Sequence, residues 1–305
     1  MKRFLTILFP ILFFASMLLF PEAALKGASS GVLLWFDTVL PTLLPFLIIT
    51  NLLIHTGAVN IISRLLAPVL CRFFRVSPYG AFVILTGFLC GCPMGGKVTA
   101  DLLKKNAISQ CEARYLLSFC NNTSPMFIIS YILLQNLKIP ALTLPLLSIL
   151  TAAPVLLSFL FRRLYHIPEP GHSFGFSRET DSVSLDDCIM NGFETITRIG
   201  GYIILFSILI SFAGLLPVRS AAVTTLLLPS LEITTGITII CSSGTSLNGQ
   251  IMKALALTSF GGWCAAAQTR AMIQGTSLPF LPYIAEKLIT ALATSLLVWI
   301  FLLIC

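Results

Sequence analysis

The stretch YGAFVILTGFLCGCPMGGKVTADLLKK, residues 79–105, decides the fold. It starts with an apolar arm, Ala81 to Cys90, continues through the glycine-rich segment GCPMGG and finishes with a polar arm that ends in Lys104 and Lys105. These arms are too short to cross a hydrocarbon core of about 30 Å and return as two full spans. The sequence therefore predicts a re-entrant hairpin whose tip, near Gly91, Gly95 and Gly96, stops close to the middle of a membrane.

The composition of the whole chain agrees with a membrane location. Of 305 residues, 56% are hydrophobic and only 10% are charged, whereas a soluble domain carries about 25% charged residues. This composition excludes a soluble enzyme, a disordered protein and a nucleic-acid-binding protein. The remaining class is an all-α polytopic membrane protein whose apolar surface meets the lipid bilayer.

Apolar runs divide the chain into two membrane halves. Spans are expected at 4–20, 31–54, 112–134, 141–161, 192–214, 254–274 and 285–304. Residues 59–75 carry three arginines and predict an amphipathic helix along the interface. The expected domains are an N-terminal helix with an external loop (1–30), a first half (31–165), a cytoplasmic linker rich in acids, proline and glycine (166–190), and a second half with the C-terminal helix (191–305).

Basic residues set the expected orientation. With the N-terminus in the cytoplasm, ten lysines and arginines fall on the inner side and four on the outer side, as the positive-inside rule requires. The two halves also resemble each other, since Phe36-Asp37-Thr38 matches Phe193-Glu194-Thr195. Three crossings separate these matches, and an odd number inverts the second copy. The sequence therefore predicts an inverted repeat, as in many secondary transporters.

Two of the expected spans are interrupted by residues that weaken a helix. In span 112–134, Pro125 follows the polar run Asn121, Asn122, Thr123 and Ser124, and unwound backbone is tolerated in lipid only when it is buried in protein or lines a wet cavity. Span 254–274 contains Gly261-Gly262, followed by Gln268. A proline kink held by neighbouring helices, and close packing at the paired glycines, are the structural alternatives.

A second hairpin is expected at residues 233–253. Its predicted tip holds Ser242, Ser243, Gly244 and Thr245. Backbone N–H groups at the two tips, together with Lys97 beside the first tip, favour an anionic ligand. The alternatives for Lys97 are a shallower hairpin from which its ammonium group reaches water, and pairing with Asp101 about one turn away, which would weaken the argument for an anion.

The motifs LTGFLCGCPMGGK (Leu85 to Lys97), YLLSFCNNTSP (Tyr115 to Pro125) and SFGGWC (Ser259 to Cys264) resemble those of the YlbJ-like sporulation integral membrane proteins, which belong with the nucleoside-recognition Gate domain proteins. The Gate fold is similar to that of concentrative nucleoside transporters, with two inverted repeats, each holding a re-entrant hairpin and a broken helix. The resemblance implies transport of dipicolinate, a planar dianion, across the outer forespore membrane during endospore formation.

Other functions stay open at this point. A nucleoside or related small-molecule transporter and a non-transporting scaffold or sensor in sporulation are the alternatives, but polar groups at membrane depth favour transport. An intramembrane hydrolase is less well supported, because no histidine follows the segment Cys241 to Gly244. The sequence holds no HExxH motif and no Walker A loop, so neither an enzyme nor a cofactor is expected. The coupling ion and a homo-oligomer are left open.

Overall fold

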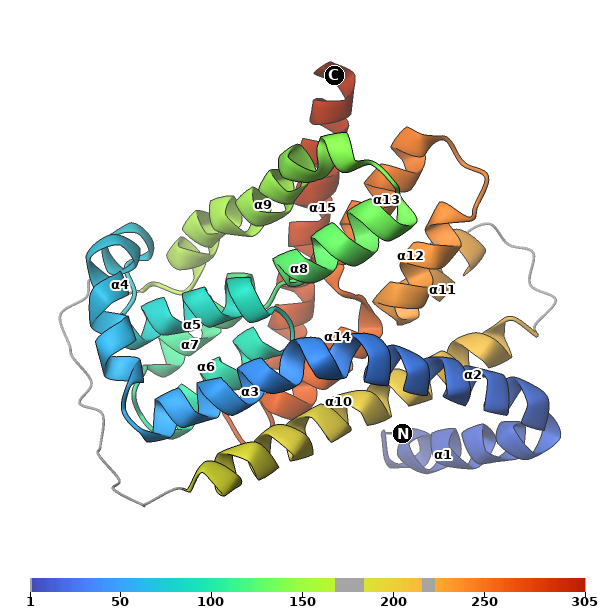
Figure 1. Ribbon diagram of the computed structural model, residues 1–305, viewed down its shortest axis with the longest axis horizontal. Coiled ribbons are helices and arrows are strands. Elements are labelled where there is room, and N and C mark those ends of the chain that lie inside the picture. Colours follow the sequence, from blue (N-terminus) through green and yellow to red (C-terminus); the bar gives the residue numbers. More distant parts are fainter. Residues whose placement is uncertain (1, 168–183, 216–222, 305) are drawn as a thin grey trace.

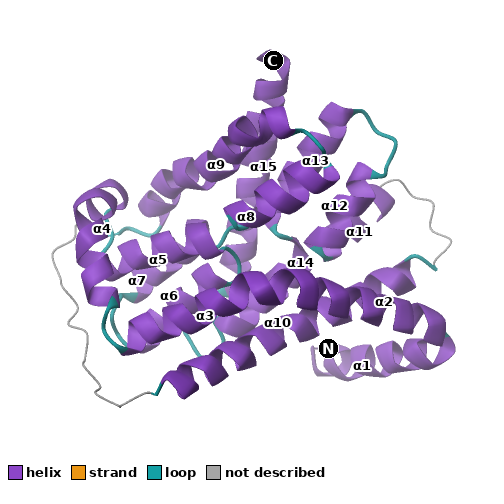
Figure 2. Cartoon of the chain, viewed as in Figure 1, coloured by secondary structure: helices purple, strands orange, loops and turns teal. Residues whose placement is uncertain are grey.

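The computed structural model describes residues 2–167, 184–215 and 223–304. Within these ranges all regular structure is helical and no strand occurs (Figure 2), which confirms the all-α prediction for the described part of the chain. The first half contains α1 (Lys2–Leu19), α2 (Pro21–Leu34), η1 (Trp35–Val39), α3 (Leu40–His55), α4 (Val59–Phe74), α5 (Pro78–Cys90), α6 (Met94–Lys104), α7 (Gln110–Cys120), α8 (Pro125–Phe127), η2 (Ile128–Asn136), η3 (Pro140–Leu142) and α9 (Thr143–Leu164). The second half contains α10 (Leu185–Ala213), η4 (Val223–Leu227), α11 (Leu228–Leu231), α12 (Ile233–Cys241), α13 (Leu247–Phe260), α14 (Gly262–Met272) and α15 (Phe280–Ile304).

Within the described residues, five helical segments are long and apolar enough to cross a membrane. They are Pro21–His55, Gln110–Asn136, Pro140–Leu164, Leu185–Ala213 and Phe280–Ile304. A sixth candidate combines α4 and α5, which are bent by 89° at the break between them. The chain is therefore an integral membrane protein with several apolar helices. The expected run 4–20 lies in α1, whose apolar part Ile7–Leu19 is shorter than a full span.

Residues 21–30 form a helix, whereas an external loop was expected there. Pro21 occupies the first turn of α2, where its fixed φ suits a helix. Helices α2 and α3, joined by the π-helical η1, then run along α10 (Figure 1). Contact with α10 is close, because a Cβ on Gly27 would lie 2.7 Å from the Cα of Ile208. This packing against α10 gives the segment a helical partner that sequence periodicity did not reveal.

Short polar side chains begin the helices that surround the site. The Ser77 hydroxyl accepts a hydrogen bond from the Gly80 N–H at the start of α5, and Ser109 does the same for Glu112 in α7. Ser184 and Asp187 form a capping box before α10. Because α10 begins at Leu185, the end of the expected linker 166–190 is helical, while residues 168–183 of that linker lie outside the described residues.

The two halves share an order of elements. In the first half the paired helices α5 and α6 precede α7, which is interrupted before α8. In the second half α11 and α12 precede α13, which is interrupted before α14. Figure 1 places α5 to α7 and α11 to α13 on opposite sides of α8 and α14. Two broken helices are thus present, while the inverted orientation of the halves and the re-entrant depth of the hairpins stay predictions.

Candidate functional site

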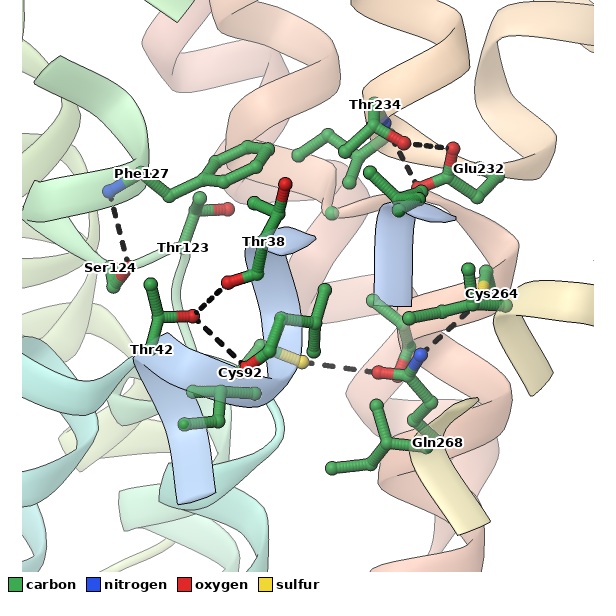
Figure 3. A pocket seen from close by; sticks show the side chains of 18 of the residues that line it. Thr38, Thr42, Cys92, Thr123, Ser124, Phe127, Glu232, Thr234, Cys264 and Gln268 are labelled. Carbon is green, nitrogen blue, oxygen red and sulfur yellow. Dashed lines mark hydrogen bonds between the residues drawn. The ribbon is translucent and has the colours of Figure 1, made fainter. Parts of the chain in front are cut away.

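A cavity of about 110 Å³ lies between the two halves, where the two helix breaks come together (Figure 3). Its walls come from η1 and α3, the α5–α6 turn, both helix breaks, α10 and the start of α12. The polar side chains on it are hydroxyls, thiols, one amide and one carboxylate, namely Thr38, Thr42, Cys90, Cys92, Thr123, Ser124, Glu232, Thr234, Cys264 and Gln268. The remaining walls are mostly aliphatic, so the cavity combines apolar surface with a few hydrogen-bonding groups, as small-molecule sites do.

The first break is a four-residue extended segment, 121–124, between α7 and α8. Its polar side chains replace the backbone hydrogen bonds that the helix loses. The Asn122 amide donates to the Phe119 carbonyl over 2.6 Å, and the Thr123 hydroxyl donates to the Thr258 carbonyl over 2.8 Å. Ser124 caps α8 by accepting from the Phe127 N–H, and Pro125 follows at the first helical position. The prediction of a broken helix at this motif is confirmed.

Asn121 connects this break to three other elements. Its Oδ1 accepts a hydrogen bond from the Gly96 N–H over 3.1 Å. Its Nδ2 donates to the Thr269 hydroxyl over 2.8 Å and to the Tyr283 hydroxyl over 2.9 Å. The side chain is only 1% exposed and does not line the cavity. Asn121 therefore positions α6, α14 and α15 around the cavity.

The first hairpin tip packs directly on the break. Gly91 has a φ of +84°, and a Cβ there would lie 2.6 Å from the Ser124 nitrogen. A Cβ on Gly95 would lie 2.4 Å from the Cys120 carbonyl oxygen. The Cys92 N–H donates to the Asn122 carbonyl. Glycine is needed at these positions because backbone of two segments meets backbone without room for a side chain.

Lys97 lies away from the cavity. Its ammonium forms an ion pair with Asp101 over 2.7 Å and contacts the Asn51 amide oxygen over 3.5 Å. It lines a different, polar depression that also includes Glu194 and Arg198. Asp101, one turn along α6, offsets the positive charge of Lys97, and a role for Lys97 in substrate binding stays a prediction.

The turn Ser242 to Ser246 also lies away from the cavity. It joins α12 to α13, and its hydroxyls bond locally: Ser243 donates to the Ile240 carbonyl and lies 3.0 Å from the Thr245 hydroxyl. Ser242, Ser243, Gly244 and Thr245 are all missing from the cavity walls. The second tip at the cavity is instead the α11–α12 turn at Glu232, where a Cβ on Gly236 would lie 2.1 Å from the Pro229 carbonyl oxygen.

Glu232 was missed in the sequence, although a lone acid inside an apolar run could have signalled it. Its carboxylate is 3% exposed and caps α12, accepting from the Thr234 N–H over 3.0 Å, from the Thr235 N–H over 2.9 Å and from the Thr234 hydroxyl. The positive end of the α12 dipole stabilises this negative charge. Glu232 is the one charged side chain among the described residues that line the cavity.

The second break consists of a left-handed glycine pair. Gly261 and Gly262 have φ values of +88° and +82°, a conformation that favours glycine. Gln268, in the second turn of α14, lines the cavity and donates to the Cys264 sulfur over 3.4 Å. Arg270 is exposed and stacks over the Phe280 ring at 5.4 Å, so it lies outside the cavity.

The predicted site residues thus separate into three groups. Thr123, Ser124, Gly261 and Gln268 line the cavity. Gly91, Gly95, Gly96, Asn121, Asn122 and Gly262 build the tip and the breaks behind it. Lys97 and the turn 242–246 lie elsewhere. Within the described residues no group of three or more His, Cys, Asp or Glu side chains is placed to hold a metal ion.

The fold and the cavity define a helical membrane protein with a polar internal site between two broken helices. Residues 36–135, which include the first hairpin and the first break, match the Gate family, described as nucleoside recognition. The chain is 29% identical over 312 residues to the sporulation integral membrane protein YlbJ of Bacillus subtilis (strain 168), covering 90% of this chain and 76% of that protein. The resemblance inferred from the motifs is therefore confirmed. No solved structure matches the chain.

Proposed function

We propose that this chain moves a small polar solute across a membrane through the cavity between its two halves. The observation that carries this proposal is the meeting of both helix breaks and both hairpin turns at one cavity. Secondary transporters bind their substrates at such interfaces between repeats, where interrupted helices present backbone and side-chain polar groups. A scaffold has little use for a buried glutamate and two interrupted helices, each of which is costly in a membrane.

The cavity walls favour an uncharged solute that donates hydrogen bonds. Glu232 offers acceptor oxygens, and the hydroxyls of Thr38 and Thr42 can accept or donate. The apolar walls suit a planar ring. A nucleoside has both features, which agrees with the description of the Gate family. A dianion would meet the negative charge of Glu232, while the positive charge of Lys97 is neutralised by Asp101.

Dipicolinate is the second candidate, and two observations favour it. The chain is similar over most of its length to a sporulation protein. A buried ammonium, that of Lys287, lies against the first helix break and would attract an anion. This candidate places the chain in the outer forespore membrane, which a fluorescent fusion in a sporulating host would test.

Uptake into proteoliposomes tests both candidates. Labelled uridine, adenosine and dipicolinate are supplied separately to the wild type, to Glu232→Gln and to Ser242→Ala, a control outside the cavity. Glu232→Gln should lower nucleoside uptake, because it removes a charged acceptor, and should leave dipicolinate uptake unchanged or raised. Ser242→Ala should match the wild type for either solute. Absence of uptake of all three solutes by a folded wild type would favour a sensor or scaffold instead.

A further inference from the structure

Lys287 is a buried lysine whose side chain lies outside the cavity. It lies on α15, is 3% exposed, and does not line the cavity. Among the residues that the structure describes, no carboxylate forms an ion pair with it. The neighbouring acid Glu286 is bonded to the Tyr165 hydroxyl instead. A buried ammonium without a counter-ion is costly, so the oxygens around it must stabilise the charge.

The oxygens around Lys287 belong to the first helix break. Its Nζ lies 3.2 Å from the Asn121 carbonyl oxygen and 3.3 Å from the Asn122 Oδ1. Asn121 is the C-cap of α7, directly after its last residue Cys120, so its carbonyl is at the negative end of a helix dipole. Backbone carbonyls at the ends of interrupted helices are ligands that transporters offer to a coupling cation, and the Asn122 amide oxygen supplies a second oxygen beside the Asn121 carbonyl.

The same two asparagines hold the first hairpin tip. Asn121 accepts from the Gly96 N–H, and the Asn122 carbonyl accepts from the Cys92 N–H. Any cation bound to their oxygens therefore connects the break to the tip that closes on the cavity. In this chain the connection is made by a covalently attached ammonium group.

We infer that Lys287 is a built-in substitute for a coupling cation, so that the first break needs no dissociable sodium ion to assemble. The inference builds on the proposed transport function, but it concerns an ion site that can be measured without transport. A vacated site in Lys287→Ala would expose the same oxygens to a small monovalent cation. Lys287→Met fills the same space with an apolar chain and leaves no such site.

Thermal unfolding of the purified protein in detergent tests this inference. Each variant is heated in choline chloride, sodium chloride, potassium chloride or methylammonium chloride at equal ionic strength. The wild type should melt at one temperature in all four salts. Lys287→Ala should melt lower in choline and recover part of the loss in one of the small cations, because a ligand of the folded state raises its stability. Lys287→Met should not recover in any salt, and Lys253→Ala should behave like the wild type.

Two results would overturn the inference. One is a wild type that melts at a higher temperature in sodium than in choline, which would show that the fold still depends on a dissociable sodium ion. The other is a folded Lys287→Ala that responds to none of the cations. If the variants fail to fold, the wild-type comparison still decides the first point. Solute uptake, measured in sodium and in choline, tests the proposed transport function separately. A variant that loses uptake but melts at an unchanged temperature bears on the transport function and not on the ion site.

Discussion

The substitution Gly87→Ala should push helix α5 of the first hairpin away from helix α7, which leads into the first break. Gly87 lies in α5, and a Cβ there would be 2.1 Å from the Cys120 carbonyl oxygen, a contact that must lengthen to at least 3.0 Å. Because the obstructing atom belongs to the backbone, no rotamer change relieves it, and α5 and α7 must move apart by about 0.9 Å. Overpacking of this kind costs about 3 kcal/mol, against about 1 kcal/mol that alanine gains over glycine in a helix.

The expected net loss of unfolding free energy is therefore about 2 kcal/mol. Thermal unfolding in detergent measures this loss of stability. Solute uptake into proteoliposomes measures the effect on the cavity. The loss of uptake should be large, because Cys120 directly precedes the first break. The matched control is Gly201→Ala in α10, where a Cβ would have no atom within 4 Å. It should be as stable as the wild type or slightly more stable. A Gly87→Ala protein as stable and as active as Gly201→Ala would refute the packing argument.

Three further outcomes are expected. The Lys97→Met variant should take up solute much as the wild type does, because Lys97 is paired with Asp101 outside the cavity. The Asn121→Ala variant should lose uptake, because Asn121 holds α14 beside the first break. Equal uptake by both variants would contradict this distinction. Ser109→Ala should lower unfolding free energy by about 1 kcal/mol through the lost α7 cap, and Ser109→Asp should not. Arg72→Cys and Asn106→Cys, each made in a cysteine-free background, place one thiol before and one after the first hairpin. Both thiols should be labelled from the same side of the membrane. Labelling from opposite sides would refute the re-entrant hairpin.

The sequence by itself determined the class of the protein and the position of its helix breaks. Apolar runs too long for a soluble core predicted membrane helices, since this signal depends only on composition along the chain. The polar run before Pro125 and the pair Gly261-Gly262 predicted the breaks, because proline and paired glycines weaken a helix wherever they occur. The glycines from Gly91 to Gly96 likewise predicted the first tip, which the structure places against the break.

Only the tertiary structure decided which polar groups meet. Two turns flank α12, and either could form the second tip at the cavity. The local sequence favoured the glycine- and serine-rich turn at 242–246. Packing of α11 on α12 instead brings Glu232, in the other turn, to the cavity. Lys287, on the last helix, reaches oxygens more than 160 positions earlier in the chain. Such contacts depend on how helices pack, and no periodicity within one helix specifies its partner. The charge around the site was therefore fixed by long-range packing, while the breaks that create the site were fixed locally.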